Sequence, residues 1–463
     1  MTRRQRTLLF FLLLSLFFVL APSFALYSQG YRIDFKAMRI TQTGAFYFKV
    51  VPTRADILID ENLVKRTDFL FGSALTKNFF PGNYFVEIAK EGYHSWQKIL
   101  EVKERQVEEA KYVLLFKKET MFQQLADAIV DFWISPDQRY ALLLEQKDGL
   151  PWELTLLNLQ TLGKEPLVEQ SKDEILNVSW AQDSKHFLIE RERTGLIIRE
   201  VHDITSSQPC SKEPCSLEYL GQNIENIQFS PAASGQVLFT KFLNETQVLF
   251  SAEYLKKEAA LPIANNVLSF ITHGNSVTWL ANDGNLWQQD LTSKSEAQKF
   301  QASLFVPKGE SSYVLFIAGD SILLKEDASL FLHERGSSIR REILSPVSEI
   351  KVASGGTRVA IKNQSELWVL FLKEETEQPQ RQASDLILLT RFSMPIDELL
   401  WVGSNYLLFS LGGNIRVSEI DNRDRLNIAD IAEFSSPKLY FDNEKGTLYV
   451  LSGGAFSVSE RLR

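Results

Sequence analysis

The stretch Phe132-Trp133-Ile134-Ser135-Pro136-Asp137-Gln138-Arg139-Tyr140, with Ala141-Leu142-Leu143-Leu144 after it, decides the fold. An apolar run ends in an aromatic residue, and Ser-Pro-Asp then predicts a turn. Pro136 fixes φ at the second turn position, and the side chains of Ser135 and Asp137 can bond the backbone that the turn leaves unpaired. The alternating segment that follows predicts a second strand. This pattern is typical of one corner of a β-propeller blade.

The pattern recurs along 129–463 at spacings of roughly 36 to 50 residues, which is the scale of propeller blades. The residues that close an apolar strand before a turn are Trp133, Trp180, Phe229, Phe270, Val306, Val352, Trp401 and Phe441. Their turns read Ser-Pro-Asp at 135–137, Ala-Gln-Asp at 181–183, Ser-Pro-Ala at 230–232 and Asp-Asn-Glu at 442–444. We therefore expect about eight blades, with seven as the alternative because the fourth and fifth repeats are weak.

Tight hairpins are the more persistent part of the repeat. Asp283-Gly284, Gly412-Gly413 and Gly453-Gly454 each separate two β-rich runs, and such dipeptides are a specific hairpin signal. Further hairpins are predicted at Gly319-Asp320 and Gln364-Ser365. A single four-stranded unit cannot bury both of its faces, so successive sheets must stack around an axis.

The aromatic-Ser-Pro-Asp corner resembles that of the TolB-like and WD40-like propellers, and the similarity covers 129–463. The last repeat ends soon after Val458, which leaves no room for an outer strand. We expect a segment near 122–125, or the preceding 112–116, to complete the last blade and close the ring.

Length, charge and cysteine content limit the kinds of partner and site that the chain can have. The chain has 463 residues, which predicts two or three folded units, and its 58 acidic against 50 basic residues give a net charge of −8. Nucleic acid is an unsuitable partner, because phosphate-backbone binders need a basic surface. The two cysteines, Cys210 and Cys215, could form a local disulfide in an exported chain. The alternative, a zinc site, lacks a histidine nearby in the sequence.

The N-terminus predicts a membrane anchor. Arg3, Arg4 and Arg6 precede an apolar run, so 1–6 should be a cytoplasmic tail and 7–27 a single-pass signal anchor, with the bulk of the chain outside the cell membrane. A signal peptide cleaved after Ala25 is the competing interpretation. Both interpretations export the protein. A buried soluble helix is disfavoured, because a segment that is apolar on all faces has no side suited to water.

Residues 28–43 are expected to be a polar connector, 44–116 a small β domain, and 117–128 a linker or closing strand. The strands predicted in the small domain are 45–52, 56–60, 84–88, 96–102 and 112–116. Tyr84, Tyr93 and Trp96 could form a sugar-binding platform, but packing residues are the expectation for a unit of this size.

The Pro81-Gly82-Asn83-Tyr84 hairpin and the corner Lys90-Glu91-Gly92-Tyr93 resemble the PEGA domain. PEGA domains are β-sandwich-like modules of bacterial and archaeal surface proteins, and the resemblance implies that architecture and a place in the cell envelope. The family's Pro-Glu-Gly-Ala signature is replaced by Pro52-Thr53-Arg54-Ala55. Arg54 stands where the family has glycine, and a positive φ is costly there, so we expect a differently shaped turn.

No catalytic or cofactor motif is present in the sequence. Asp421-Asn422-Arg423-Asp424-Arg425 faintly suggests a calcium loop, but the two arginines stand where oxygen ligands are wanted, so a solvated turn is expected. The charged run 373–381 is expected to be a solvated loop. The tryptophans Trp133, Trp180 and Trp401 are expected to pack rather than to ring a ligand. The histidines expected to be ordinary surface or packing residues are His94, His186, His202, His273 and His333.

The sequence thus predicts an all-β protein with an N-terminal transmembrane helix, a PEGA-like sandwich and a propeller. We expect it to act as a scaffold without catalytic residues, cofactor or metal. One propeller face would bind another envelope protein, a peptide or a cell-wall polymer. The alternative function is an exported hydrolase or lyase that acts on polysaccharide with paired carboxylates near the channel mouth.

Overall fold

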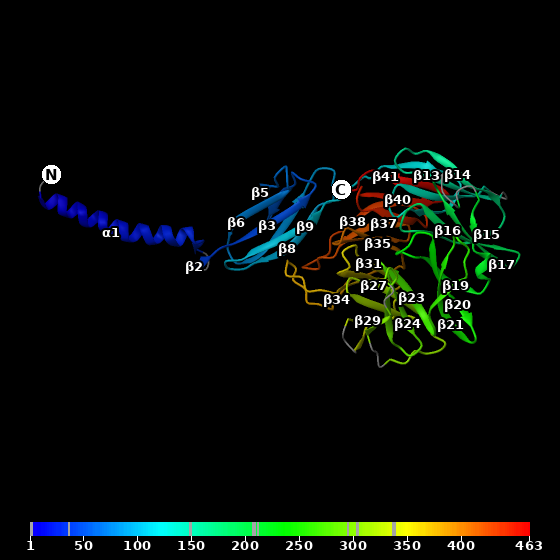
Figure 1. Cartoon of the computed structure of the whole chain (residues 1–463). Coiled ribbons are helices and arrows are strands. Elements are labelled where there is room, and N and C mark those ends of the chain that lie inside the picture. Colours follow the sequence, from blue (N-terminus) through cyan, green and yellow to red (C-terminus); the bar gives the residue numbers. More distant parts are fainter. Residues whose placement is uncertain are drawn as a thin grey trace.

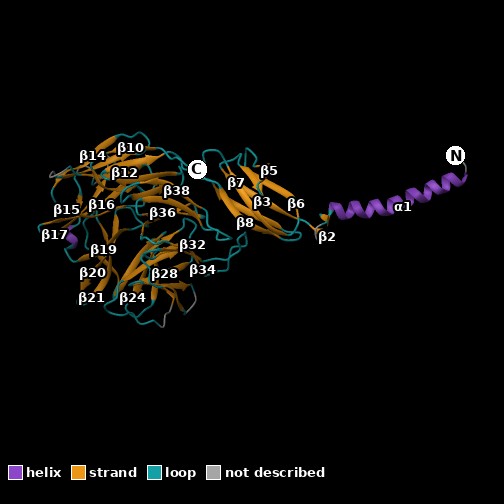
Figure 2. Cartoon of the chain, turned by 180° about the vertical axis from the view of Figure 1, so that it is seen from behind, coloured by secondary structure: helices purple, strands orange, loops and turns teal. Residues whose placement is uncertain are grey.

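The structure is a computed structural model that describes residues 3–35, 38–147, 151–205, 210, 213–293, 296–301, 305–335 and 339–463. Three parts follow one another along the chain: a helix, a small β-sandwich and a ring of β-sheets (Figure 1). The helix and the ring lie at opposite ends of the sandwich, and Figure 2 shows the same order from behind. The all-β class predicted for the bulk of the chain is confirmed.

The helix α1 spans Arg3–Ser28. Its stretch Arg4–Ser28 is long and apolar enough to cross a membrane, and its apolar side chains are exposed rather than packed against other described residues. A helix that is apolar on all sides cannot be satisfied by water, so this exposure agrees with either a membrane anchor or a signal sequence.

Residues 28–43, expected to be a connector, contain a two-stranded antiparallel sheet. It consists of β1 (Tyr31–Asp34) and β2 (Arg39–Gln42). Tyr31 pairs with Gln42 and Asp34 with Arg39, so the chain leaves the helix, turns and returns. The prediction missed this hairpin because its strands are only four residues long.

The sandwich consists of a three-stranded sheet, β6-β3-β9, and a four-stranded sheet, β5-β4-β7-β8. Its strands are β3 (Gly44–Val51), β4 (Asp56–Ile59), β5 (Asn62–Arg66), β6 (Ser73–Phe79), β7 (Gly82–Ala89), β8 (Trp96–Val102) and β9 (Val107–Leu114). The two sheets enclose one buried core that includes Phe46, Ile57 and Ile88. β3 and β9 pair in parallel, which brings both ends of the unit into one sheet.

Several local predictions for this unit were incomplete. β5 and β6 were not predicted, because β5 is exposed along its whole length and carries no alternation. Arg54 adopts φ 60°, so arginine occupies the left-handed conformation that glycine would favour, and the expected reshaping of the turn is wrong at this residue. Tyr84 donates to the carbonyl oxygen of Phe80 at 2.9 Å and packs on Phe46, which makes it a packing residue.

The ring contains eight four-stranded sheets among the described residues, which we number as blades in chain order of their inner strands. Blade one consists of β11 (Ile129–Ile134), β12 (Tyr140–Glu145), β13 (Trp152–Asn158) and β14 (Lys164–Ser171). Blade two consists of β15 (Glu174–Trp180), β16 (His186–Arg193), β17 (Leu196–Asp203) and β18 (Cys215–Ser216). Blades three and four are β19 (Ile224–Phe229), β20 (Gln236–Leu243), β21 (Thr246–Glu253), β22 (Leu261–Ala264), and β23 (Val267–His273), β24 (Ser276–Ala281), β25 (Leu286–Asp290), β26 (Gln298–Gln301).

Blades five and six are β27 (Tyr313–Ala318), β28 (Ser321–Glu326), β29 (Ser329–Glu334), β30 (Arg340–Leu344), and β31 (Glu349–Val352), β32 (Arg358–Lys362), β33 (Glu366–Phe371), β34 (Asp385–Arg391). Blade seven is β35 (Ile396–Val402), β36 (Tyr406–Leu411), β37 (Asn414–Glu419), β38 (Ile428–Glu433). Blade eight is β39 (Lys438–Asp442), β40 (Thr447–Ser452), β41 (Ala455–Ser459) and β10 (Phe122–Ala126). The count of eight blades is therefore confirmed for the described chain.

Neighbouring blades contact one another through their inner strands, for example β23 with β27, β31 with β35 and β35 with β39. The ring is closed by β10, which pairs antiparallel with β41 so that Gln123 lies opposite Val458. Of the two segments that the sequence offered for this role, the chain uses 122–126, whereas 112–114 belong to β9, which pairs in parallel with β3 in the sandwich. The closing strand therefore lies directly after the sandwich in the chain.

The fifth repeat was placed one strand too early. Val306 was expected to close an inner strand, but it lies outside the sheets and is 80% exposed. The inner strand of blade five is β27, and its Gly319-Asp320 turn joins the first and second strands instead of the second and third. The error arose because β27 has no aromatic-Ser-Pro-Asp ending, so the nearest apolar run was taken instead.

Candidate functional site

A buried lysine joins the sandwich to the propeller. Lys98 lies on β8, and its ammonium group contacts the Oε1 atom of Glu419 at 2.8 Å. The same group donates to the backbone carbonyls of Asp421, Arg423 and Arg425 at 2.8, 2.8 and 2.6 Å. Alternate carbonyls of the connection 420–427, between β37 and β38, thus point at one cation. We call this arrangement the Lys98 cage.

Glu419 has further partners inside the cage. Trp96 donates its indole N–H to Oε2 at 2.8 Å, and Asn427 donates its side-chain N–H to Oε1 at 2.7 Å. Burial raises the pKa of Glu419 above its ordinary value, and the ammonium of Lys98 opposes this effect. The lysine therefore contributes to stabilising the charged form of this buried carboxylate, together with the hydrogen bond from Asn427.

The turn predicted for 421–425 is exposed at Asn422, Asp424 and Arg425, as expected, but it also contacts the sandwich. Burial raises the pKa of Asp421, but the hydrogen bond and positive charge of Arg423 outweigh it, so the pKa lies below its ordinary value. Arg423 also donates to Glu108 at 2.6 Å, and Asp424 accepts from the backbone N–H of Ile99 at 2.9 Å. The loop does enclose a cation, as a calcium loop would, but the cation is the side chain of Lys98.

The charged run 373–381 also docks on the sandwich instead of being only solvated. Gln378 accepts from the backbone N–H of Glu109 at 2.6 Å, and Glu377 accepts from the hydroxyl of Tyr112 at 2.5 Å. Beside these contacts lies a polar hollow of about 760 Å³, lined by residues that include Glu101, Lys103 and Gln378. The contact between sandwich and propeller is therefore hydrogen-bonded and has a hollow along one side.

Sequence reasoning missed Lys98, although a signal was available. In Trp96-Gln97-Lys98-Ile99-Leu100 the lysine shares a strand face with Trp96 and Leu100, and all three side chains are buried. A lysine on the apolar face of an alternating strand needs a buried partner. The partner was not detectable, because it lies more than three hundred residues away in the sequence and is mostly backbone.

The three tryptophans hold neighbouring blades together. Trp180 donates its indole N–H to the carbonyl of Trp133 at 3.1 Å, and Trp401 donates to the carbonyl of Lys351 at 2.9 Å. Each bond crosses from one inner strand to that of the preceding blade. These side chains therefore contribute to packing, as expected.

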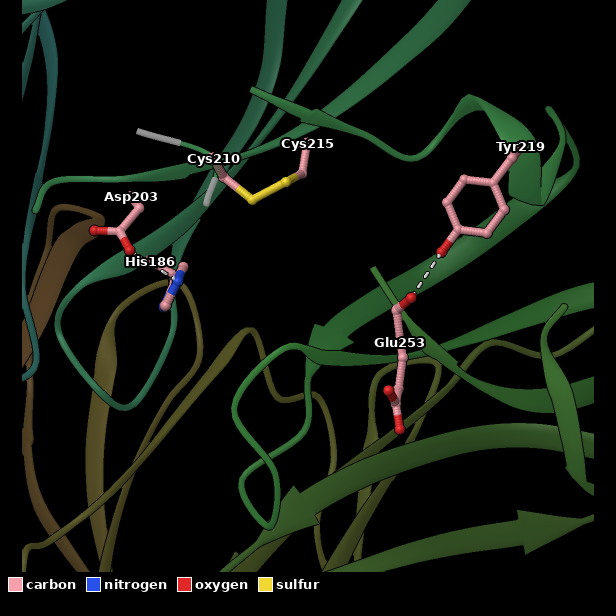
Figure 3. The surroundings of a disulfide bond; sticks show 6 residues. All are labelled: His186, Asp203, Cys210, Cys215, Tyr219 and Glu253. Carbon is pink, nitrogen blue, oxygen red and sulfur yellow. Dashed lines mark hydrogen bonds and ion pairs between the residues drawn. A yellow bond between two sulfur atoms is a disulfide. The ribbon is translucent and has the colours of Figure 1, made fainter. Parts of the chain in front are cut away.

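His186 is a buried residue that contacts two carboxylates. Its Nδ1 atom lies 2.7 Å from Asp183 and its Nε2 atom 3.1 Å from Asp203. The side chain of Asp203 is fully buried, and its backbone N–H donates to the carbonyl of Cys210 at 3.1 Å. Cys210 is bonded to Cys215 beside this cluster (Figure 3). The cluster and the disulfide thus lie together at one rim of blade two.

Replacing His186 with asparagine should change how stability depends on pH. The hydrogen bond to Asp183 raises the pKa of His186 above 6.5, against the effect of burial. A raised pKa means that the folded state binds the proton more tightly, so this stabilisation is complete below about pH 6.5 and is lost as pH rises through the folded pKa. We expect the variant to lose roughly 2–4 °C in thermal midpoint at pH 5.5 and less at pH 8. The control is His273→Asn, and an equal loss at both pH values would contradict the prediction.

The other histidines are placed singly. Burial lowers the pKa of both His202 and His333 to about 4, so each is neutral at pH 7. His94 contacts the carbonyl of Asp430 at 3.1 Å across the joint. No three or more His, Cys, Asp or Glu side chains of the described ranges are grouped so that they could hold a metal ion.

Two long hairpins lie at the end of the blades that is opposite to the contact between sandwich and propeller. Neighbouring strands of a blade are antiparallel, so successive turns alternate between the two ends of the blade. The connections between third and fourth strands that contact the sandwich lie at one end. The turns between second and third strands lie at the other end. The hairpins β16–β17 and β20–β21 have eight-residue strands, against five and six in β32 and β33. Figures 1 and 2 both show them on the side of the propeller away from α1.

The tips of these two hairpins expose apolar side chains. Leu196 is 55% exposed, Phe242 58% and Leu243 41%. We call these three residues the hairpin-tip surface. The hairpins are neighbours, since the segment 220–224 bonds both: Gln222 accepts from the backbone N–H of Ile197 at 3.2 Å, and Leu220 accepts from Lys241 at 2.9 Å. A group of exposed apolar side chains on rigid strands is typical of a protein interaction surface.

Carboxylates also occur on the inner strands. Burial and the negative charge of Glu349 raise the pKa of Glu398 above its ordinary value. Glu349 in turn contacts Lys362 at 3.1 Å and Lys351 at 2.9 Å. The two lysines neutralise the charge of Glu349. Such an arrangement is found in structural ion-pair networks as well as in acid–base pairs.

Comparisons with known proteins give no family. No family model matches the chain, and no curated protein matches it. Among solved structures, the Dos1 propeller is 11% identical with a TM-score of 0.48 and covers 74% of this chain and 95% of its own. The β-propeller domain of Myceliophteria thermophila Cps50 (Swd1) is 11% identical with a TM-score of 0.43, covering 73% and 99%. The computationally designed Ika8 protein is 14% identical with a TM-score of 0.45, covering 74% and 99%. The propeller assignment itself rests on the eight sheets described above.

Proposed function

We propose that this protein is a membrane-anchored scaffold that displays its propeller outside the cell and binds another envelope protein at the hairpin-tip surface. The observation that carries the proposal is the Lys98 cage, which fixes the sandwich to the propeller through buried charge. A scaffold needs such a joint, because a loose one would let the binding surface move relative to the membrane. α1 would supply the anchor, with Arg3, Arg4 and Arg6 on the cytoplasmic side.

The hairpin-tip surface suits a protein partner better than a sugar polymer. Leu196, Phe242 and Leu243 offer exposed apolar area, and buried apolar anchors dominate protein interfaces. The expectation of a bound peptide or cell-wall polymer remains open as an outcome of the test below. The disulfide between Cys210 and Cys215 would suit an oxidising compartment.

Crosslinking in cells tests this proposal. A photoreactive residue at Phe242 in the full chain should give a specific protein adduct, and Leu196→Asp in the same chain should weaken it at least about tenfold, because a charge is placed in an apolar contact. The matched control position is Leu261, which is 68% exposed on the outer strand β22. Equal adducts at Leu261, or adducts that ignore Leu196→Asp, would contradict the proposed surface. A carbohydrate adduct at Phe242 would favour a polymer ligand.

The hydrolase alternative has one observation in its favour, the raised pKa of Glu398 beside Glu349. Glycoside hydrolysis requires one protonated carboxyl and one carboxylate. If the protein has this activity, the purified full chain should cleave a polysaccharide and Glu398→Gln should lower the rate at least about a hundredfold. Unchanged turnover in that variant would remove this alternative.

A further inference from the structure

The hairpin β1–β2 folds back along the end of α1. An apolar pocket of about 550 Å³ is lined by Ser23 and Leu26 from the helix and by Ile33, Phe35 and Ile40 from the hairpin. Ser23 lies five residues before the last helical residue, Ser28. At 1.5 Å per residue, the hairpin therefore reaches back about 7 Å along the helix axis.

The hairpin is held in this position by Arg32. Its guanidinium donates to the carbonyl oxygens of Tyr27 and Tyr31, both at 2.8 Å, and to the side chain of Asn78 at 3.0 Å. The same group stacks on the ring of Tyr27, 3.6 Å from its centroid. One arginine thus caps the helix end and ties helix, hairpin and sandwich together, so the position of the hairpin is set by the fold.

The hairpin exposes apolar side chains that nothing in the described protein covers. Phe35 is 79% exposed, Ile40 63% and Ile33 58%. Exposed apolar side chains that gather in one place mark a contact with a partner or a membrane. These side chains lie beside the last turns of an apolar helix, and this position favours a contact with the membrane over a contact with a partner.

The depth of these side chains follows from the helix length. The apolar residues 7–27 span about 31 Å, against a hydrocarbon layer of about 30 Å. Ser23 then lies inside the edge of that layer, and Phe35 and Ile40 lie near this edge because they line one pocket with it. Aromatic residues are the ones that prefer this interfacial depth.

We propose that the β1–β2 hairpin is a second membrane contact, embedded in the outer leaflet, and that an acyl chain of a bilayer lipid fills the pocket between hairpin and helix. This inference rests on the proposed membrane anchor. It gives the anchor an orientation: a helix alone can rotate about its axis, whereas a helix with a lateral lipid-embedded hairpin presents the sandwich, and with it the propeller, in one direction.

Quenching by spin-labelled lipid tests the inference on the full chain in a Cys210→Ser/Cys215→Ser background. A fluorophore is attached at Leu16→Cys, Ile40→Cys or Leu63→Cys, and the protein is placed in phosphatidylcholine vesicles that contain doxyl-labelled phosphatidylcholine. Ile40 and Leu63 are both 63% exposed, which makes Leu63, on β5 of the sandwich, the matched control. Phe35→Cys gives a second reading at the hairpin.

We expect several-fold quenching at Leu16, Ile40 and Phe35 and little at Leu63. Quenching at Leu16 with Ile40 and Phe35 no different from Leu63 would overturn the hairpin contact and leave the anchor in place. If Leu16 is not quenched either, or if mass analysis finds that the helix has been removed, the anchor itself fails and the inference fails with it.

Discussion

Replacing Lys98 with methionine is expected to lower the free energy of unfolding of the sandwich–propeller unit by about 3–5 kcal/mol. Methionine has nearly the same volume, so the change removes a charge without opening a large cavity. It leaves Glu419 buried without its cation, together with three carbonyls that lose their donor. An unpaired buried carboxylate is the costlier of the two defects.

Hydrogen exchange is the suitable measurement, because it reports separately on β8 and on the connection 420–427. Both should lose protection in Lys98→Met, and the thermal midpoint should fall. The matched control is Lys103→Met, which removes an exposed lysine 3.6 Å from Glu101 and should cost no more than about 0.5 kcal/mol. Adding Glu419→Gln to Lys98→Met should restore part of the loss, because it removes the stranded charge. A Lys98→Met protein as stable as the Lys103→Met protein would refute the role of the cage.

Replacing Val458 with proline is expected to open the ring. Val458 pairs with Tyr449 of β40 on one side and with Gln123 of β10 on the other, so β41 is an interior strand. Proline has no N–H to donate and does not fit an interior strand, and we expect a loss of about 3 kcal/mol. The edges freed by the loss of pairing are templates for association, so aggregation should accompany the loss.

The control for Val458→Pro is Lys164→Pro on β14, an outermost strand. Pro166 already occupies the same strand two residues later. Residues two apart in a strand direct their backbone N–H groups to the same side, so proline at position 164 removes an N–H on the side where the chain already has a proline. Light scattering and the thermal midpoint measured on both variants decide the matter. If Val458→Pro behaves like Lys164→Pro, the pairing of β10 with β41 contributes little to stability.

The propeller could be predicted from the sequence because its signals are local. The corner at Ser135-Pro136-Asp137 and the Gly412-Gly413 and Gly453-Gly454 turns specify short hairpins without information from elsewhere in the chain. The same locality explains the error at Val306. Blade five lacks the Ser-Pro-Asp corner. No local signal therefore showed that Gly319-Asp320 is the turn of its first hairpin rather than of its second.

The contact between sandwich and propeller could not be predicted because most of the groups that bind Lys98 are backbone carbonyls. Carbonyl groups of Asp421, Arg423 and Arg425 form the Lys98 cage, and their side chains, which the sequence does reveal, point to other uses. The arginines that argued against a calcium site hold the loop in shape, since Arg423 bonds Asp421. Sequence reasoning identifies groups that bind through side chains far more readily than groups that bind through the main chain.

The pairing of β10 with β41 also has a consequence for synthesis. The ribosome delivers β10 before every other strand of the propeller and β41 after every other described strand, so the first propeller strand to emerge must wait for the last. A nascent chain that stops early would leave two bare sheet edges for a chaperone or protease to recognise. Closure of the ring therefore requires that β41 has been translated.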